Sequence, residues 1–285
     1  MHRSTILAGS FAAILFALAP RPANAQFVEF TDVTGSNLQL GSIPSGDDEE
    51  KDIAVGDFNK DGWDDAVVVR KRRFSNPGAR QDVLLMNRNG TLVNETAAFA
   101  PQMISNSTDA RDVRVVDVDL DGWDDLVVCN TFGEQPVLHI NQGEDGNGDW
   151  QGFDDESGRL PTLNPDGPLQ FCAVWSGDLT GNGAPDLYFC NYNAFGSTTD
   201  ALLINDGAGN FTDETDARLS SAQFGDYARS AFGTDAEFHD MDNDGDLDIV
   251  KLTTLFDVDP FDDRGVFILF NNGNGFFQHT PLPGD

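Results

Sequence analysis

The stretch Asp240–Asp248, which reads DMDNDGDLD, decides the fold predicted for this chain. Asp240, Asp242 and Asp244 alternate with other residues and Gly245 follows, so three short carboxylates converge where the backbone turns sharply. Calcium takes about six to eight oxygen ligands, and a D-x-D-x-D-G loop supplies them from alternate side chains and from a carbonyl after the glycine. We therefore expect a calcium-binding loop, closed by Asp248 at the ninth position.

The same loop occurs three more times. It reads DFNKDGWDD at 57–65, DVDLDGWDD at 117–125 and DLTGNGAPD at 178–186, so the four loops begin at positions 57, 117, 178 and 240. A spacing this regular predicts four repeats of one supersecondary unit. In chain order the four are loops 1 to 4, and the residues within each loop are positions 1 to 9.

Each loop lies between short apolar runs that predict strands. One strand precedes the loop, a second follows it, a third ends at an asparagine, and a fourth follows a turn. Four antiparallel strands per period of about 60 residues predict an all-β fold, a β-propeller-like array of four-stranded blades. The repeats are expected at about 50–96, 110–157, 171–215 and 233–280, with an extra N-terminal strand at 27–34.

The extra strand leaves the closure of the propeller open. The last repeat already has a fourth strand, so the N-terminal strand is not needed to complete it. A ring of four blades with a spare strand, an open arc of blades and part of a longer architecture all fit this count. Open sheet edges invite pairing with another chain, so self-association through a blade edge is one expectation.

The N-terminal segment has the features of a secretory signal peptide. Arg3 precedes an apolar run at Ile6–Ala19, and small residues stand at the two key positions of Ala23–Ala25. About 14 apolar residues are too few to span a bilayer, and no later stretch is long enough. We expect a signal peptide at 1–25, a repeat domain at 26–285, and a secreted, periplasmic or cell-surface protein without a membrane span.

The chain is strongly acidic. Its 48 Asp and Glu residues against 17 Lys and Arg give a net charge of −31. Such a surface repels nucleic acid and anionic membranes, so neither is an expected partner. The 22 phenylalanines supply a core, which argues against disorder. Five cations, Arg70–Arg73 and Arg80, cluster in one segment, where they serve either internal charge balance or an anionic partner.

The three cysteines leave two alternatives open. Cys172 and Cys190 lie on the strands that flank loop 3 and can pair across a hairpin in an oxidising compartment. In the other alternative both are buried thiols, like Cys129, since free cysteine is a common small core residue.

These repeats resemble the FG-GAP or VCBS-type repeat, the blade unit of the integrin α-subunit propeller and of many secreted bacterial proteins. The resemblance covers about 30–280 and is most specific in the four D-x-[DN]-x-[DN]-G-x-x-D loops. It implies a β-propeller with one Ca²⁺ in each loop, held by the side chains at positions 1, 3, 5 and 9 and the carbonyl at position 7. The implied ligands are Asp57, Asn59, Asp61, Trp63 and Asp65 in loop 1; Asp117, Asp119, Asp121, Trp123 and Asp125 in loop 2; Asp178, Thr180, Asn182, Ala184 and Asp186 in loop 3; and Asp240, Asp242, Asp244, Asp246 and Asp248 in loop 4.

Loop 3 departs from the pattern, because Thr180 and Asn182 replace two carboxylates. Calcium affinity follows ligand charge, so this site is expected to be the weakest or empty, and the chain to bind three to four Ca²⁺ ions. Asp and Asn also favour tight turns, so acidic loops that hold no metal remain an alternative.

The resemblance implies a recognition or adhesion scaffold with structural calcium and with a protein or glycan ligand on the variable loops of one face. No G-x-S-x-G elbow, H-E-x-x-H pair or Gly-rich phosphate loop occurs, so no catalytic residue and no further cofactor are assigned. The alternative is an extracellular hydrolase or lyase that acts on polysaccharide. Such an enzyme would place two carboxylates outside the calcium loops, about 5 to 10 Å apart in a cleft.

Overall fold

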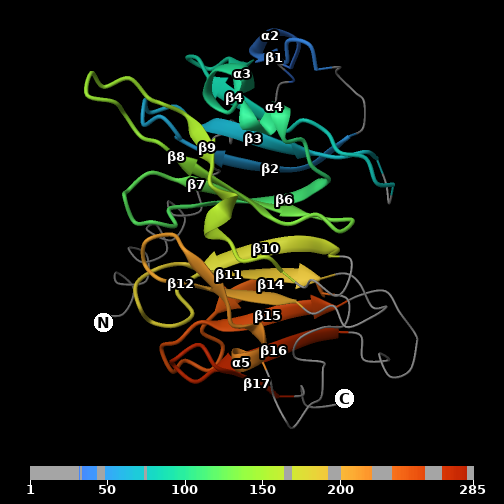
Figure 1. Ribbon diagram of the computed structural model, residues 1–285, viewed down its shortest axis with the longest axis vertical. Helices are drawn as coiled ribbons and strands as arrows, with labels where there is room; N and C mark the ends of the chain where they lie inside the picture. Colours follow the sequence, from blue (N-terminus) through green and yellow to red (C-terminus); the bar gives the residue numbers. More distant parts are fainter. Residues whose placement is uncertain are drawn as a thin grey trace, which may run out of the picture. The chain divides into compact units, whose positions relative to one another are not determined.

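The computed structural model (Figure 1) describes residues 32, 34–43, 49–73, 76–163, 169–191, 200–219, 233–253 and 265–280. The chain divides into two compact units, Met1–Ser36 and Asn37–Asp285, and all four sheets lie in the second. The predicted signal peptide lies outside the described residues. So does most of the predicted strand 27–34, and its last residue, Thr34, begins the short helix α2 (Thr34–Asn37) instead.

Four antiparallel sheets, here called blades 1 to 4, follow one another along the chain (Figure 1). Blade 1 contains β2 (Glu50–Gly56), β3 (Asp65–Arg70), β4 (Val83–Asn87) and β5 (Leu92–Asn94). Blade 2 contains β6 (Ala110–Val116), β7 (Asp125–Asn130), β8 (Val137–Asn141) and β9 (Phe153–Asp155). Blade 3 contains β10 (Phe171–Gly177), β11 (Asp186–Asn191), β12 (Ala201–Asn205) and β13 (Phe211–Asp213). Blade 4 contains β14 (Gly233–His239), β15 (Asp248–Thr253), β16 (Gly265–Asn271) and β17 (Phe277–Thr280). The predicted all-β, propeller-like array is therefore confirmed.

The extra strand joins the first blade. β1 (Leu38–Gln39) pairs in parallel with β5, in the register Leu38 to Leu92. Together with Leu40 and Ile43 it covers Ala66, Val83 and Leu85 of blade 1. This strand comes later in the chain than the predicted one, and it widens the first blade because it brings apolar side chains to a sheet face that no preceding blade covers.

A short helical turn follows the fourth strand of the first three blades. These turns are α3 (Thr96–Phe99) with α4 (Gln102–Ser105), the 3-10 turn η1 (Ser157–Arg159), and α5 (Thr215–Arg218). Each begins at a Thr or Ser whose hydroxyl oxygen accepts a strand N–H, from Leu84, Leu138 and Leu202 respectively. The turn is thereby tied to the third strand of its own blade.

Side chains of each blade alternate between a forward face, toward the next blade in chain order, and a backward face. Val67 and Val69 on the forward face of blade 1 pack with Leu126 and Val128 on the backward face of blade 2. Two similar apolar clusters fill the junctions of blades 2 with 3 and 3 with 4. The core of the protein is thus divided among the junctions between blades.

The innermost strands β2, β6, β10 and β14 lie next to one another in chain order. Each carries a β-bulge near its start, between Glu50 and Asp52 in β2 and at the equivalent places in the others. Among the described strands, β14 has no comparable contact with β2. The array is therefore open in the part of the chain that the structure describes.

The cysteines are three buried free thiols. Cys190 pairs in register with Ala173, beside Cys172, and no disulfide joins the two. Burial raises the pKa of the Cys172 thiol to about 11, so it stays protonated at neutral pH. Of the two alternatives, the structure therefore has buried thiols and not a disulfide between Cys172 and Cys190.

The basic cluster is paired within the protein. Arg80 forms an ion pair with Glu49, and the Arg70 guanidinium lies 3.9 Å from Glu49 and 3.4 Å from Glu50. The ammonium group of Lys71 is buried and donates to the carbonyl of Arg72 at 3.1 Å. Internal charge balance is therefore the role that the structure gives the two arginines, whereas Lys71 is a buried donor to a backbone carbonyl.

Within the described ranges every α-helix is a four-residue turn, so none has the length or the apolar character needed to cross a bilayer.

Candidate metal centre

The first aspartate organises each acidic loop as a tight turn. Its Oδ2 atom accepts the N–H of the glycine at position 6 in all four loops, at 2.8–3.1 Å. The side-chain Oδ1 atom at position 5 accepts the N–H of position 7, at 2.8–3.0 Å. The four loops therefore share one conformation, although their sequences differ.

Glycine at position 6 is required by the backbone. Its φ angle is 90°, 91°, 88° and 101° in Gly62, Gly122, Gly183 and Gly245, a region that side chains disfavour. Position 4 also has a positive φ, in Lys60, Leu120, Gly181 and Asn243. Two left-handed residues in each loop bend the chain so that positions 1, 3 and 5 point to one side.

In loops 2 and 4 the structure brings the predicted carboxylates together. One oxygen from each of Asp117, Asp119 and Asp121 lies within 4.8 Å of the others, and Asp240, Asp242 and Asp244 have the same arrangement. Partial desolvation and the nearby carboxylate of Asp244 raise the pKa of Asp242. A divalent cation would relieve this repulsion.

Loops 1 and 3 bring fewer charges to the same place. In loop 1 the amide of Asn59 lies between the carboxylates of Asp57 and Asp61, and it donates to Asp61 at 3.0 Å. In loop 3 Asp178 is the one carboxylate in the first six positions. The amide of Asn182 donates to the carbonyl of Asn205 at 3.0 Å.

Unpartnered oxygens test whether a cation suits these loops. Asp117 Oδ1 and Asp119 Oδ1 in loop 2 are buried, and no described residue donates a hydrogen bond to them. Thr180 Oγ1, at position 3 of loop 3, is in the same state. A buried polar atom without a partner costs about 1–3 kcal/mol. Hard oxygen donors with free lone pairs fit Ca²⁺, so the residues present suit the ion that the repeats imply.

The aspartate at position 9 joins the loop to two strands. Asp65, Asp125, Asp186 and Asp248 are fully buried. One oxygen of each accepts the N–H of position 2, at 2.8–3.2 Å, and the other accepts the N–H of the asparagine that ends the third strand, at 2.7–2.9 Å. Their role as ligands stays a prediction, as does that of the carbonyls at position 7.

Burial raises the pKa of two of the aspartates at position 9. Desolvation raises the pKa of Asp65 to about 6 and that of Asp125 to about 7, against the lowering effect of the backbone N–H groups that each accepts. A cation close by would hold both groups in the charged form.

Asparagines at the ends of the third strands lock neighbouring blades together. The Nδ2 atoms of Asn141, Asn205 and Asn271 donate to the carbonyl of position 2 in the preceding blade's loop, at 2.8–2.9 Å. The same atoms donate to the carbonyl of position 8 in their own loop, at 3.0–3.2 Å. Each lock therefore connects two acidic loops. The sequence showed the recurring asparagine, but its partner lies in the preceding repeat, so spacing alone gave it no role.

Two basic side chains add further links between neighbouring loops. Arg159 lies 3.1 Å from Asp119 in loop 2 and donates to the carbonyl of Ala208 in blade 3 at 3.1 Å. Lys60 of loop 1 lies 3.8 Å from the ring centroid of Trp123 in loop 2. The loops and the turns beside them thus form one connected row.

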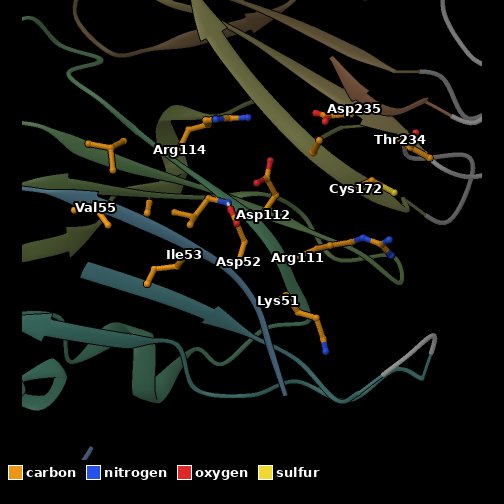
Figure 2. A pocket seen from close by; sticks show the side chains of 14 residues that line it. Lys51, Asp52, Ile53, Val55, Arg111, Asp112, Arg114, Cys172, Thr234 and Asp235 are labelled. Atoms are coloured by element: carbon orange, nitrogen blue, oxygen red, sulfur yellow. Dashed lines mark hydrogen bonds between the residues drawn. The ribbon is translucent and has the colours of Figure 1, made fainter. Parts of the chain in front are cut away.

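A cavity of about 560 Å³ lies along the innermost strands, lined by residues of β2, β6, β10 and β14 (Figure 2). The carboxyl groups of Asp52 and Asp112 lie next to each other within it. Burial and the hydrogen bond between the two groups raise the pKa of Asp112 to about 7. Each also accepts a backbone N–H of the next blade, Asp52 from Val113 at 3.2 Å and Asp112 from Val174 at 2.7 Å. This pair lies outside the acidic loops.

No curated protein matches the chain, and the solved structures to which it is distantly similar include the following two. A lectin of Agrocybe aegerita, described for its recognition of non-reducing terminal N-acetylglucosamine, is 16% identical with a TM-score of 0.42, over 81% of this chain and 65% of the lectin. The V. cholerae biofilm matrix protein Bap1 is 12% identical with a TM-score of 0.39, over 85% of this chain and 32% of its own. The chain spans less than two thirds of either protein, and these low scores carry no conclusion about its ligand.

A family model of the FG-GAP-like repeat matches residues 57–128 and 178–251, just over half of the chain. Each matched segment begins at position 1 of a loop and runs into the second strand of the following blade, β7 or β15. It therefore contains two loops, one junction between blades and the third strand with its terminal asparagine. With this match to the repeated unit of its fold, the chain belongs to the family of FG-GAP-like repeat proteins.

Proposed function

We propose that this chain is an exported, calcium-stabilised propeller scaffold that recognises a protein or a glycan through the variable loops of one face. The observation that carries the calcium part is the pair of unpartnered buried oxygens in loop 2, Asp117 Oδ1 and Asp119 Oδ1, within a group of three carboxylates. In loop 2 the N–H groups of Gly122 and Trp123 bond to Asp117 Oδ2 and Asp121 Oδ1, so these two Oδ1 atoms keep their lone pairs for a cation.

Calcium in this proposal is structural. The oxygens of each loop converge only in the folded blade, so the ion binds the native state and not the unfolded chain. At free calcium of about ten times the dissociation constant, each occupied site adds about 1.4 kcal/mol to the free energy of unfolding. Extracellular modules bind calcium with dissociation constants of about 0.1–1 mM, which suits the export that the N-terminal sequence predicts.

The experiment that tests this proposal is a calorimetric calcium titration of the chelator-treated protein, with melting curves in calcium and in chelator. We expect three to four sites and a higher melting temperature in calcium. Asp242→Ala should remove one site and part of the stabilisation. Asp154→Ala is the control, because Asp154 is exposed and outside the loops. No heat of binding and an unchanged melting temperature would contradict the calcium assignment.

A second candidate is an extracellular hydrolase that acts on polysaccharide, and the Asp52–Asp112 pair favours it. The two carboxyl groups share a hydrogen bond, so they lie closer together than the about 5 to 10 Å of a glycosidase pair, but a carboxyl group in a cavity with its pKa raised to about 7 can act as a general acid. Asp112→Asn separates the two candidates. Loss of polysaccharide cleavage with unchanged calcium binding would support the enzyme, and absence of cleavage by the wild type would leave the scaffold.

A further inference from the structure

The two ends of the blade array carry the unmatched halves of one repeated junction. At the three junctions between blades, the apolar residue at position 2 of the loop is buried by the next blade, as Phe58, Val118 and Leu179 show. Its carbonyl accepts the asparagine lock of that blade. The corresponding residue of blade 4, Met241, is 42% exposed.

The forward face of blade 4 is apolar and uncovered elsewhere too. Leu252 holds the strand position that Val69, Cys129 and Cys190 hold in the other blades, as the register with the inner strands shows. Those three side chains are fully buried, whereas Leu252 is 40% exposed. Val266, its cross-strand partner, is 44% exposed.

Blade 1 presents the complementary half on its backward face. Ile53 holds the position of Val113, Val174 and Ala236, which are buried against the preceding blade, yet it is 57% exposed. Val55, two residues on, is exposed as well. Leu38, Leu40 and Ile43 cover only the part of this face around β3 and β4, so the inner strand β2 remains open.

The polar groups at the two ends match as donor and acceptor. Asn87 is the lock of blade 1, and among the described residues its Nδ2 atom donates only to Asp64, within its own blade. It lacks the second acceptor that the other three locks have, which is the carbonyl of position 2 in a neighbouring loop. Met241 of blade 4 holds that position in loop 4. Asp235 of blade 4 likewise holds the register position of Asp52 and Asp112, whose carboxylates accept an N–H of the next blade.

We propose that blade 4 docks on blade 1 of a second copy of this chain, head to tail. The contact repeats the junction that already holds the blades together, with Met241 and Leu252 of one copy against Ile53 and Val55 of the other. Two identical faces of blade 4 would instead bring acceptor against acceptor, so the head-to-tail arrangement is favoured. Two copies that join at both ends close a ring.

Sedimentation and light scattering of the full chain in calcium buffer test this proposal. The wild type is expected to have a mass above that of the monomer. Leu252→Lys and Ile53→Lys each place a charge in the contact and should each give a monomer. Mixed in equal amounts, the two variants should form a dimer that grows no further, because each supplies the face that the other retains.

Ile104→Lys is the matched control, since Ile104 is 39% exposed and lies in α4, outside the acidic loops and the two end faces. It should associate like the wild type. If Leu252→Lys does not fold, Val266→Lys blocks the same face. A monomeric wild type would overturn the proposal, and so would an Ile53→Lys variant that still associates fully, because that result means pairing of two blade 4 faces.

Discussion

Replacing Asn205 with alanine should loosen blade 3 from blade 2 at a cost that the structure allows to be worked out. The side chain makes four hydrogen bonds, donating to Val118 and Pro185 and accepting from Gly207 and Gly209, at 2.8–3.2 Å. At about 1 kcal/mol net for each bond, Asn205→Ala should lower the free energy of unfolding by about 4 kcal/mol.

Asn87→Ala is the matched control for this change. Asn87 ends the equivalent strand of blade 1, but its side chain makes two of these bonds, with Asp64 and Gly90. It should therefore cost about 2 kcal/mol. Urea unfolding of both variants measures the difference, with the free energy of unfolding and the m value fitted for each. Equal losses for the two variants would refute the idea that the asparagine locks join blades.

The Asn205 lock also predicts an effect on calcium in the neighbouring blade. Val118, whose carbonyl it holds, is position 2 of loop 2, and its N–H bonds to Asp125 at 2.9 Å. Asn205→Ala should therefore weaken calcium binding at loop 2, although the substitution lies in blade 3. Calorimetry of this variant beside Asn87→Ala checks the coupling, and an unchanged binding curve would contradict it.

Three further outcomes follow from the buried polar groups. Burial raises the pKa of Asp125 to about 7, so the folded state holds a proton that the unfolded chain releases near pH 4. Without calcium, the free energy of unfolding should therefore fall as the pH rises from about 4 to 7. Asp125→Asn should make this fall smaller in urea unfolding at a series of pH values. Lys251→Met leaves the buried carboxylate of Asp200 without its cation and should cost about 3–5 kcal/mol, with part regained in the double variant Asp200→Asn/Lys251→Met, as thermal unfolding would show. Thiol titration should find no reactive cysteine in the native protein and three after unfolding without reductant; a count of one would mean a disulfide.

The sequence was sufficient for the blades because their determinants are local. Each loop, each glycine at position 6 and each strand-ending asparagine lies within one period of the repeat, and the structure has the predicted strands at these places. The clustering of Asp117, Asp119 and Asp121 was predictable for the same reason, since alternate residues of one turn must face one side.

What the sequence could not predict depends on contacts between repeats. The pair of Asp52 and Asp112 meets across two inner strands that belong to different repeats, and neither residue is part of a recognisable motif. The position of β1 was also missed, because two residues of strand are set by the uncovered face of blade 1 and not by their own pattern. The strand pattern of residues 30–34 was the stronger local signal, and it lies largely outside the described residues.

The asparagine locks also impose an order on synthesis at the ribosome. The carbonyl of Phe58 waits for an asparagine 83 residues downstream, that of Val118 for one 87 residues downstream, and that of Leu179 for one 92 residues downstream. At about 5–20 residues per second, each newly made blade therefore spends several seconds with its loop incompletely anchored. During synthesis these bonds can form only in chain order, because each asparagine leaves the ribosome after the carbonyl that it binds.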